Sequence, residues 1–373
     1  MDYIALGCMT GTSLDGIDCS LVKTDGTTYV TEILNEFTPY SDNLKGRLID
    51  VLDQNYLHDP TLLKSLSNEY KNAINNIINE FNDKIDVIGI HGQTVLHEPS
   101  LGISIQLYDK RNLYETQAPI ICNFRKNDIL NGGSGAPIIP IYHQIISQQY
   151  KIANCVFVNI GGVSNITIIN EGSIVAGDSS FGNAIINDYL KNYNNYEFDL
   201  NGEMSRNGKR IDSLFNKIKS DLFFSKKLPK SLDRNYFHNY LNNLPKNFES
   251  KDIIFTLLSI IPDSINSLIP KNKKFHIILS GGGRKNLTLV KLFKNDFDNV
   301  SLIDDFQLDG DFIESQGMGL LAVRYLKKIP STFKKQKNAD VSMETISKSN
   351  HLFEGKLDPL MNTMTKYIEK NKS

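Results

Sequence analysis

The stretch GCMTGTSLDGIDCSLV, residues 7–22, places three glycines, four hydroxyl residues and two acids between two apolar runs. The flanking runs at 2–9 and 17–25 are short and apolar, which predicts two strands joined by a turn. Glycine lets the backbone approach a phosphate and point N–H groups at its oxygens, and hydroxyls add donors. The residues therefore leave two interpretations open: an ordinary tight hairpin, and a hairpin whose turn holds a phosphate.

Two later stretches also place glycines directly after an apolar strand. ANCVFVNIGGVSNITIINEG at 153–172 has the plan of the first hairpin, and FHIILSGGGRKNLTLVKLF at 275–293 runs from a strand through three glycines into a helix. One glycine-bearing turn is ordinary structure. Three of them, at the start of each half and at a late strand–helix junction, favour a nucleotide site and a duplicated α/β unit.

Helical spacing of apolar residues predicts helices over 44–55, 59–84 and 314–328, the second starting at Asp59-Pro60. Apolar runs predict strands within 85–95 and 118–130. A chain of 373 residues exceeds a single core, so we expect two domains, one of 1–135 plus 315–373 and one of 136–314. Beyond Pro330 the polar, lysine-rich composition predicts a loosely packed tail with one short helix near 358–370.

Charge and composition exclude several classes of protein. The 41 basic residues nearly balance the 42 acidic ones, which argues against nucleic-acid and membrane-surface partners. The four cysteines are scattered singly among apolar residues, as expected in a reducing compartment. The start of the chain lacks a secretion signal, and no apolar run is long enough to cross a membrane, so we expect a soluble cytoplasmic protein.

The sequence does not match the familiar nucleotide-binding and hydrolase motifs. GEMSRNGKR at 202–210 has one residue too many for a Walker loop and lacks the hydroxyl after lysine. GGGRKN at 281–286 lacks the third glycine of a dinucleotide fingerprint, and the chain has no Gly-x-Ser-x-Gly elbow. A nucleotide site here would belong to another fold.

Eight motifs in order, GCMTGTSLDGID, GIHGQTVLHEP, NFRKNDILNGGSGAPIIP, VNIGGVSNIT, GDSSFGN, PKSLDR, LSGGGRKN and ESQGMGLLA, resemble the anhydro-N-acetylmuramic acid kinase family. The resemblance spans residues 3 to 325. It implies an α/β fold of two ribonuclease-H-like domains of the sugar kinase, heat-shock ATPase and actin superfamily, with ATP and sugar in an interdomain cleft. It also implies cleavage of the 1,6-anhydro ring of the sugar by ATP and water, with phosphorylation of O6.

The resemblance assigns ATP binding to three glycine turns. The first is expected to hold the phosphates through Gly11, Thr12, Ser13, Leu14, Asp15, Gly16, Ile17 and Asp18. The second contributes Gly161 and Gly162, and the third receives the adenosine end at Gly281, Gly282 and Gly283. Asp15 and Asp18 are the nearest acids for orienting Mg²⁺ through water, and no direct metal ligand is assigned. Asp15 bonding its own backbone as a turn former is the alternative.

The resemblance also assigns the sugar site, in which Asp178 is the base that takes a proton from the attacking water. A structural alternative is that Asp178 caps a helix beginning near Phe181. The expected sugar contacts are His91, Gln93, Thr94, Arg125, Asn183 and Glu314. Arg125 and Glu314 have an alternative role as halves of structural ion pairs, and His91 has one as a structural hydrogen-bonding residue.

The chain departs from the family pattern after Asp178. Relatives usually read Thr-Gly-Pro-Gly-Asn there, and this chain reads SSFGN at 179–183. We expect this change to put a bulky ring, Phe181, near the sugar and to bring the substrate's identity into question. Besides anhydro-N-acetylmuramic acid, the open alternatives are another anhydrosugar such as levoglucosan and a non-kinase, actin-like ATPase. A homodimer is also left open.

Overall fold

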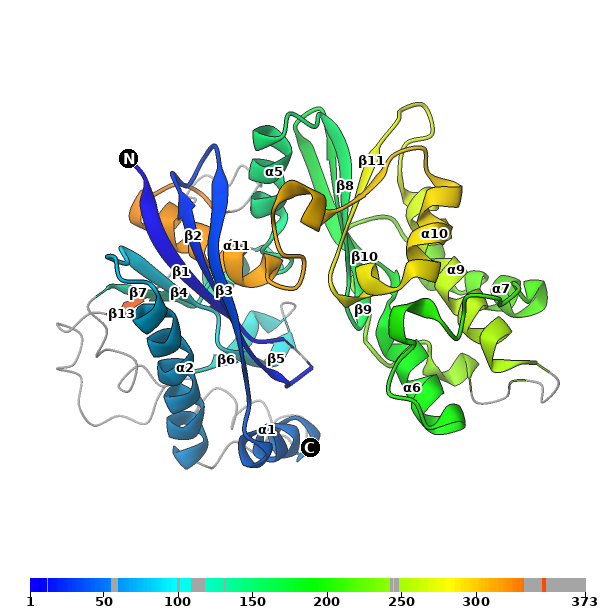
Figure 1. The fold of residues 1–373 in the computed structure, drawn as a ribbon, viewed down its shortest axis with the longest axis horizontal. Helices are drawn as coiled ribbons and strands as arrows, with labels where there is room; N and C mark the ends of the chain where they lie inside the picture. The colour runs from blue at the N-terminus through cyan, green and yellow to red at the C-terminus, as the bar shows by residue number, and fades with distance from the viewer. Residues whose placement is uncertain are drawn as a thin grey trace. The chain divides into compact units, whose positions relative to one another are not determined.

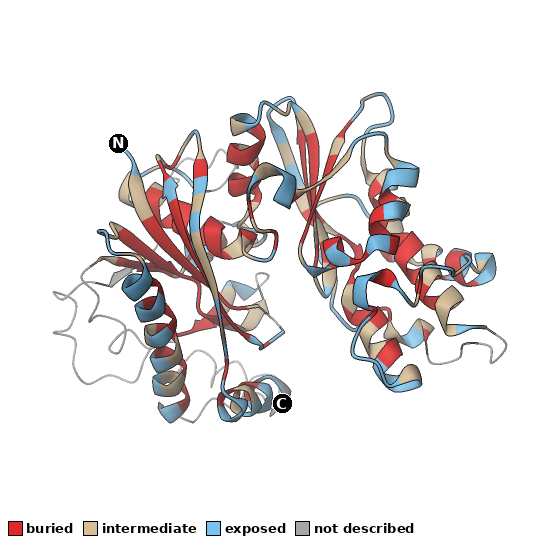
Figure 2. Ribbon diagram, in the orientation of Figure 1, coloured by how far each residue is buried: buried red, intermediate tan, exposed pale blue. Residues whose placement is uncertain are grey.

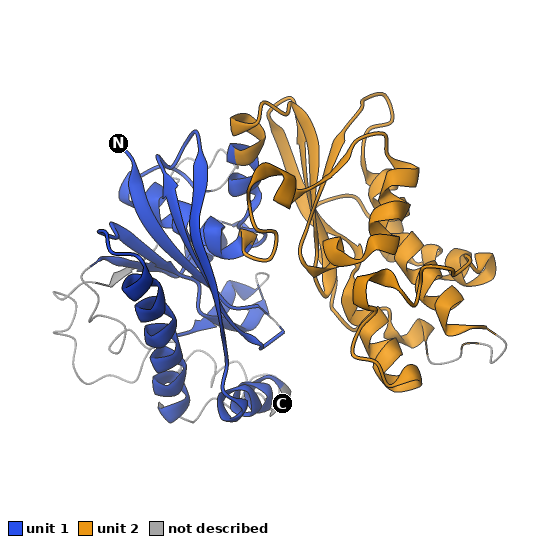
Figure 3. Ribbon diagram, viewed as in Figure 1, with its two compact units in different colours: residues 1–145, 314–373 blue, residues 146–313 orange. Residues whose placement is uncertain are grey.

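The computed structural model describes residues 1–11, 13–54, 60–98, 101–108, 118–130, 132–241, 244, 248–331 and 344–346. The chain divides into two compact units, residues 1–145 with 314–373 and residues 146–313 (Figure 3). The chain passes between them within helix α5 (Pro140–Gln149) and again at the start of helix α11 (Ile313–Leu326). The sequence prediction set the first boundary at residue 135.

Unit 1 is built on a six-stranded sheet in the order β13-β7-β4-β1-β2-β3 (Figure 1). Its strands are β1 (Tyr3–Met9), β2 (Gly16–Thr24), β3 (Val30–Pro39), β4 (Val87–Ile90), β7 (Ile120–Cys122) and β13 (Glu344–Ile346). A small second sheet pairs β5 (Gln93–Glu98) with β6 (Ile103–Leu107). The helices are α1 (Asp42–Gln54), α2 (Pro60–Glu80), α4 (Lys126–Leu130), α5 and α11.

Unit 2 repeats this plan with the order β10-β9-β8-β11-β12. Its strands are β8 (Asn154–Ile160), β9 (Val163–Asn170), β10 (Ser173–Phe181), β11 (His276–Ser280) and β12 (Val300–Leu302). Its helices are α6 (Asn183–Asn194), α7 (Asp212–Lys219), α8 (Leu222–Ser225), α9 (Ser250–Leu268) and α10 (Leu287–Asp296), with short 3₁₀ turns η2 (Leu200–Gly202), η3 (His238–Tyr240), η4 (Gly282–Lys285) and η5 (Ile303–Phe306). In both units three antiparallel strands are followed by two parallel ones, which confirms the predicted duplication.

The two faces of the unit 1 sheet are covered differently, because successive side chains of a strand point to opposite faces. Leu6 and Cys8 of β1 join the apolar core that includes α1 and α2. Gly7, between them, faces α11, and a Cβ there would lie 1.9 Å from the Ser315 carbonyl oxygen. Only glycine therefore allows α11 to lie this close to β1, and the close packing fixes the start of α11.

The core of unit 2 lies between its sheet and the helices of that unit, as the buried strand positions in Figure 2 show. Inward-facing Val156 and Val158 of β8 pack with α6, α9 and α10 in one apolar cluster. Burial of such side chains contributes ~25 cal/mol per Å² of apolar surface. The sheet and its helices thus form a rigid support for the loops at the strand ends.

Most predicted elements are confirmed, with local differences. The hairpin of β1 and β2 and the hairpin of β8 and β9 form as predicted, and α2 begins at Pro60. Only 120–122 of the run at 118–130 is strand, since the chain turns into α4 at Lys126. The predicted helix at 358–370 lies outside the described residues. Within the described part of the chain, no helix has the length and apolar character needed to span a membrane.

Candidate functional site

Three parallel strands of unit 1 end at one edge of its sheet. β1 leads into Gly11, β4 into His91, and β7 into Arg125. Ligands of open α/β sheets commonly bind at the carboxyl ends of such strands. Residues that the sequence assigned to the phosphates and to the sugar therefore meet at the same edge.

The turn between β1 and β2 is held in place by hydrogen bonds and by one buried side chain. Leu14 has φ 55° and buries its side chain in the unit 1 core, while Tyr40 donates its backbone N–H to the Asp15 carbonyl at 2.9 Å. Gln93 donates from Nε2 to the Gly11 carbonyl at 3.1 Å and accepts from the Tyr40 hydroxyl at 3.2 Å. The predicted contact residue Gln93 thus supports the hairpin turn.

The exposed tip of this turn carries Ser13 and Asp15, and the Ser13 hydroxyl donates to Asp15 Oδ1 at 2.7 Å. The Asp15 carboxylate is thus held by a neighbouring side chain, and no described bond joins it to its own backbone as the turn-former alternative required. Gly16, Ile17 and half-buried Asp18 lie in β2. Thr12 lies outside the described residues.

His91 is buried and joins two residues of the edge. Arg125 donates from Nε to His91 Nε2 at 2.9 Å, and His91 Nδ1 lies 2.8 Å from the Gly92 carbonyl oxygen. Nε2 must therefore be unprotonated and Nδ1 must carry the proton. Burial and the Arg125 charge lower the pKa of His91 well below its usual value, so the ring stays neutral. His91 therefore accepts a hydrogen bond that positions Arg125, and its contact with the sugar stays a prediction.

Arg125 is held on its other side by the loop after α4. It donates from NH1 to the Gly135 carbonyl at 2.8 Å, and the Gly135 amide donates to Asp128 Oδ2 at 2.7 Å. Burial lowers the pKa of Arg125 to about 10, while the Glu314 charge opposes this. A guanidinium of that pKa is still fully charged at neutral pH.

Glu314 follows Ile313 at the start of α11 and is half-buried. Burial raises its pKa, and the charge of Arg125 opposes the rise. Among the described residues, no ion pair within 4.0 Å joins Glu314 to Arg125. The charges of Arg125 and Glu314 therefore shift each other's pKa, while no described bond between them occupies their hydrogen-bonding atoms. Thr94, in β5, is half-buried beside Gln93.

The matching edge of unit 2 gathers the other glycine turns. β8 leads into Gly161 and Gly162, and β11 leads into Gly281. Asn183 donates its backbone N–H to the Gly161 carbonyl at 2.7 Å and its Nδ2 to the Ile160 carbonyl at 3.3 Å. Asn183, predicted as a sugar contact, thus lies with the glycines of unit 2.

Gly281 needs the conformational freedom of glycine. Its φ is +72°, and a Cβ there would lie 2.3 Å from Asn159 Oδ1. Gly282 and Gly283 continue the turn as η4 before α10 begins. The absence of side chains, with Gly282 exposed at the middle of the turn, suits close contact with a flat base or ribose.

Asp178 lies in β10, next to a bulge between Asp178 and Ser180. The segment that includes Lys230 and Leu232 holds it: the Asp178 amide donates to the Lys230 carbonyl at 2.8 Å, and the Leu232 amide donates to Asp178 Oδ2 at 2.7 Å. Burial raises the pKa of Asp178 to about 6, and the Leu232 bond and the Lys230 charge oppose that rise. The carboxylate is thus oriented and largely ionised at neutral pH.

The helix-capping alternative for Asp178 is wrong. Helix α6 begins at Asn183, and its N-cap is Gly182, which makes no side-chain capping bond. The bulge also orients the residues after Asp178. The Ser179 hydroxyl donates to the Ser164 carbonyl at 3.0 Å, and the Ser180 hydroxyl to the Phe181 carbonyl at 2.7 Å.

The expectation for Phe181 is wrong as well. Its ring is 1% exposed within the unit 2 core and packs edge-on against Phe237, with 5.3 Å between ring centroids. An aromatic ring gains more by burial there than at a polar strand end. The SSFGN departure therefore changes the core of unit 2 and puts no bulky ring at the surface where a sugar would bind.

Comparison with known proteins shows the family. The profile described as anhydro-N-acetylmuramic acid kinase matches residues 3–345. The chain belongs to the anhydro-N-acetylmuramic acid kinase family.

Two similar members of the anhydro-N-acetylmuramic acid kinase family come from Pelagibacter ubique and Gluconobacter oxydans. The first is 34% identical over 371 residues, covering 88% of this chain and 94% of its own. The second is 31% identical over 344 residues, covering 88% and 95%. Among solved structures, component A of (R)-2-hydroxyglutaryl-CoA dehydratase from Acidaminococcus fermentans covers 86% of this chain and 98% of its own, at 11% identity and a TM-score of 0.46. That score is low, so the family assignment rests on the sequence comparisons.

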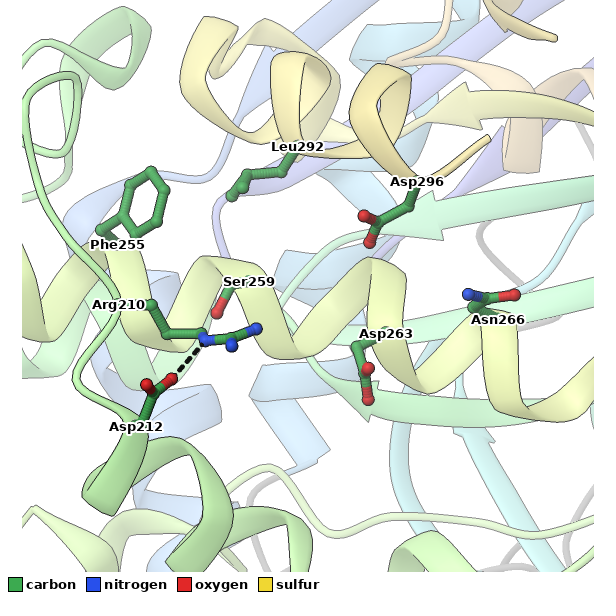
Figure 4. Close-up of a pocket in the computed structure, with 8 residues that line it drawn as sticks. All are labelled: Arg210, Asp212, Phe255, Ser259, Asp263, Asn266, Leu292 and Asp296. Carbon is green, nitrogen blue, oxygen red and sulfur yellow. Dashed lines mark hydrogen bonds and ion pairs between the residues drawn. The ribbon is translucent and has the colours of Figure 1, made fainter. Parts of the chain in front are cut away.

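In this member of the anhydro-N-acetylmuramic acid kinase family, a pocket of about 400 Å³ lies on unit 2 outside the predicted site (Figure 4). It is lined by side chains of α9, α10, the start of α7 and the residues just before α7: Arg210, Asp212, Phe255, Ser259, Asp263, Asn266, Leu292 and Asp296. None of these is a predicted site residue. Within the described residues no group of three or more histidine, cysteine, aspartate or glutamate side chains is arranged to hold a metal.

Sequence reasoning missed the residues that support the site. The Leu232 amide and the Lys230 carbonyl act through the backbone, which residue identity does not reveal. The motif PKSLDR, which contains both, was the available signal. Tyr40 lies in no motif, and nothing in the sequence marks its bonds to the hairpin turn.

Proposed function

We propose that this protein uses ATP and water to open the 1,6-anhydro ring of 1,6-anhydro-N-acetylmuramic acid and phosphorylates O6, giving N-acetylmuramic acid 6-phosphate. The family match over residues 3–345 supports the reaction class. The observation that carries the mechanism is the oriented, half-buried Asp178 carboxylate with a pKa of about 6. The reaction belongs to the recycling of cell-wall sugars.

Asp178 acts as the general base toward the attacking water. The Leu232 amide occupies Oδ2, and no described hydrogen bond uses Oδ1, so this oxygen is available for the proton of the water. A base with a pKa just below the working pH is ionised yet still accepts a proton readily. Water adds to the anomeric carbon, the bond from that carbon to O6 breaks, and O6 keeps the electron pair.

The electron pair on O6 then attacks the γ-phosphorus of ATP, and ADP leaves. Phosphoryl transfer depends mainly on position and charge neutralisation. We assign the phosphates to the hairpin turn with Gly11, Ser13 and Asp15, whose backbone amides would donate to them. The exposed Ser13 hydroxyl, which donates to Asp15, would turn away from that carboxylate to donate to a phosphate oxygen. We assign the adenosine end to Gly281, Gly282 and Gly283.

Mg²⁺ fits this assignment through the exposed carboxylate of Asp15. The ion usually keeps several waters and takes one or two carboxylates beside the phosphates. Asp15 and Asp18 would hold it through water, and when bound it would neutralise phosphate charge. The Asp15 carboxylate also orients the Ser13 hydroxyl at the tip of the turn.

Arg125 and Glu314 are assigned to the sugar. The planar donor fork of Arg125 suits a carboxylate such as the lactyl group of muramic acid. His91 holds Nε of that fork and Gly135 holds NH1, so the guanidinium is preorganised. Glu314 would accept from a sugar hydroxyl. That ATP and sugar bind between the units stays a prediction.

The test is ADP release by purified protein with Mg²⁺, ATP and a panel of sugars. We expect release only with 1,6-anhydro-N-acetylmuramic acid, together with a phosphorylated product of the opened ring. Levoglucosan, which lacks the lactyl carboxylate and the acetamido group, should react far less. Sugar-independent ADP release that no sugar stimulates would instead identify an actin-like ATPase, and preference for levoglucosan would move the assignment to another anhydrosugar.

We place the activity in the cytoplasm. The four cysteines are free and buried, in agreement with a reducing compartment. Cys8 and Cys19 lie opposite each other on β1 and β2, and the Cys19 thiol donates a hydrogen bond to Cys8 Sγ at 3.4 Å without a disulfide between them. A homodimer remains an open prediction that light scattering would test.

A further inference from the structure

Arg284, directly after the glycine turn of unit 2, is a buried cation with three acidic partners. Its side chain is 5% exposed. Nε and NH2 donate to the two oxygens of Asp304 at 2.7 and 3.0 Å, NH1 donates to Asp311 at 2.6 Å, and NH2 donates to Asp309 at 3.2 Å. A charge is buried at low cost only with such partners, so this arrangement is specific.

The same guanidinium also bonds the glycine turn. Arg284 NH1 donates to the Gly281 carbonyl at 3.2 Å, and the Gly281 amide donates to the Gly310 carbonyl at 3.1 Å. Both backbone polar groups of Gly281 are therefore held, one by Arg284 and one by the segment that supplies the three carboxylates. These bonds hold Gly281 at its φ of +72°, a backbone conformation that glycine adopts readily and other residues do not.

The segment 304–311 continues directly into the start of α11. Within it the Asp311 amide donates to Asp309 Oδ1 at 2.9 Å, and the Phe312 amide donates to the Asp309 carbonyl at 3.1 Å. Glu314 follows two residues after Phe312. One side chain thus connects the glycine turn to the stretch of chain that leads to an assigned sugar contact.

We propose that Arg284 is a positioning residue for nucleotide binding, which holds the Gly281–Gly283 turn in its binding shape and joins it to the segment 304–313. This inference rests on the proposed function, because it takes the turn as the site of the adenosine end. Arg284 acts through the Gly281 peptide and does not touch the nucleotide. A nucleotide on the turn therefore stabilises the segment 304–312 as well.

The chain offers a matched control beside Arg284. Lys285 is 59% exposed and pairs with the same Asp311, at 2.5 Å, but makes no described bond to Gly281 or Asp304. Arg284→Lys keeps the charge and loses the planar fork that reaches both the carboxylates and the carbonyl. Lys285→Gln removes a charge from the cluster and leaves the turn intact.

The experiment measures ADP affinity by calorimetry and steady-state kinetics on the full chain. Arg284→Lys should weaken ADP binding at least about tenfold and raise KM for ATP to match. KM for the sugar should stay within about twofold, as should every constant of Lys285→Gln, since exposed ion pairs contribute little. A merely structural role would reduce the amount of active protein and so lower kcat without moving KM.

Hydrogen exchange supplies a second readout. ADP should slow exchange in peptides covering 304–312 in the wild type and in Lys285→Gln, and this protection should be lost in Arg284→Lys. Wild-type affinity in a folded Arg284→Lys protein, or equal weakening by Lys285→Gln, would overturn the inference. If Arg284→Lys does not fold, Asp304→Asn removes the bidentate partner instead, and unchanged ADP affinity in that variant overturns it too.

The outcome separates this inference from the proposed function. If the wild type binds no ADP, both fail. If it binds ADP and phosphorylates the sugar while Arg284→Lys binds ADP equally well, only the positioning role of Arg284 fails.

Discussion

Replacing Asp178 with asparagine should remove activity without removing the fold. Loss of a general base costs ~10²–10⁴ in rate, which corresponds to ~3–5.5 kcal/mol of transition-state stabilisation. The Leu232 amide, which donates to Asp178 Oδ2 at 2.7 Å, keeps an acceptor in the asparagine amide oxygen. The local geometry of β10 should therefore survive.

The pKa of Asp178 predicts the direction of the stability change. Burial raises this pKa from 3.8 to about 6 in the folded protein. Holding the ionised carboxylate there costs at most about 3 kcal/mol, since each pKa unit corresponds to about 1.36 kcal/mol. The wild type gains this stability as the pH falls from about 6 to about 4. Asparagine carries no charge and so avoids the cost of burying an ionised carboxylate. The variant should therefore melt at or above the wild-type melting temperature at pH 7, and the difference between the two melting temperatures should become smaller at acid pH.

The assay combines sugar-dependent ADP release, calorimetric binding of an ATP analogue and thermal melting at pH 4 and pH 7. In the wild type kcat/KM should fall below about pH 6 as Asp178 takes a proton. The control is Glu171→Gln, in the exposed turn between β9 and β10, the strand that carries Asp178. Glu171 pairs there with Lys273, and this variant should keep its activity. The reasoning is refuted if Asp178→Asn retains a tenth of wild-type kcat/KM or more, or if it loses nucleotide binding and melts lower at pH 7.

Three further substitutions test other parts of the account. His91→Gln replaces the ring nitrogen that accepts from Arg125 Nε, so steady-state kinetics should show KM for the sugar raised about tenfold and KM for ATP unchanged. An equal rise in both KM values would contradict the assignment of Arg125 to the sugar. Gly281→Ala, which forces a Cβ to within 2.3 Å of Asn159 Oδ1, should weaken ADP binding in calorimetry at least about tenfold, whereas Gly46→Ala, in open space on α1, should not. Phe181→Ala should cost ~3–5 kcal/mol in denaturant unfolding without changing the preference among anhydrosugars, and a changed preference would return Phe181 to the sugar site.

The parts of the fold that follow local patterns were predictable. The hairpin of β1 and β2 follows from two apolar runs around glycines, and Asp59-Pro60 marks the start of α2. The repeat of the strand–glycine–strand plan indicated the duplication, which the matching order of the two sheets confirms. Such signals lie within a few neighbouring residues, so a single sequence reveals them.

Long-range contacts explain the misses. Phe181 follows a bulge in β10, and the bulge turns its ring into the core against Phe237, a residue far along the chain. Asp178 is held by backbone groups of 230–232, and Arg284 by carboxylates of 304–311. Sequence motifs indicated Asp178 and the glycines, and PKSLDR contained the backbone groups that orient Asp178 without indicating that role. The carboxylates that hold Arg284 lie in none of the motifs, and nothing local in the sequence pairs them with it.

The most direct test of the proposed reaction is to run it in ¹⁸O-labelled water and analyse the early product by mass spectrometry. The account predicts one labelled oxygen on the anomeric carbon of N-acetylmuramic acid 6-phosphate and none in the phosphoryl group, because water attacks the sugar and O6 attacks ATP. Label in inorganic phosphate, with the anhydro ring left intact, would show that water attacks ATP instead and would contradict the account.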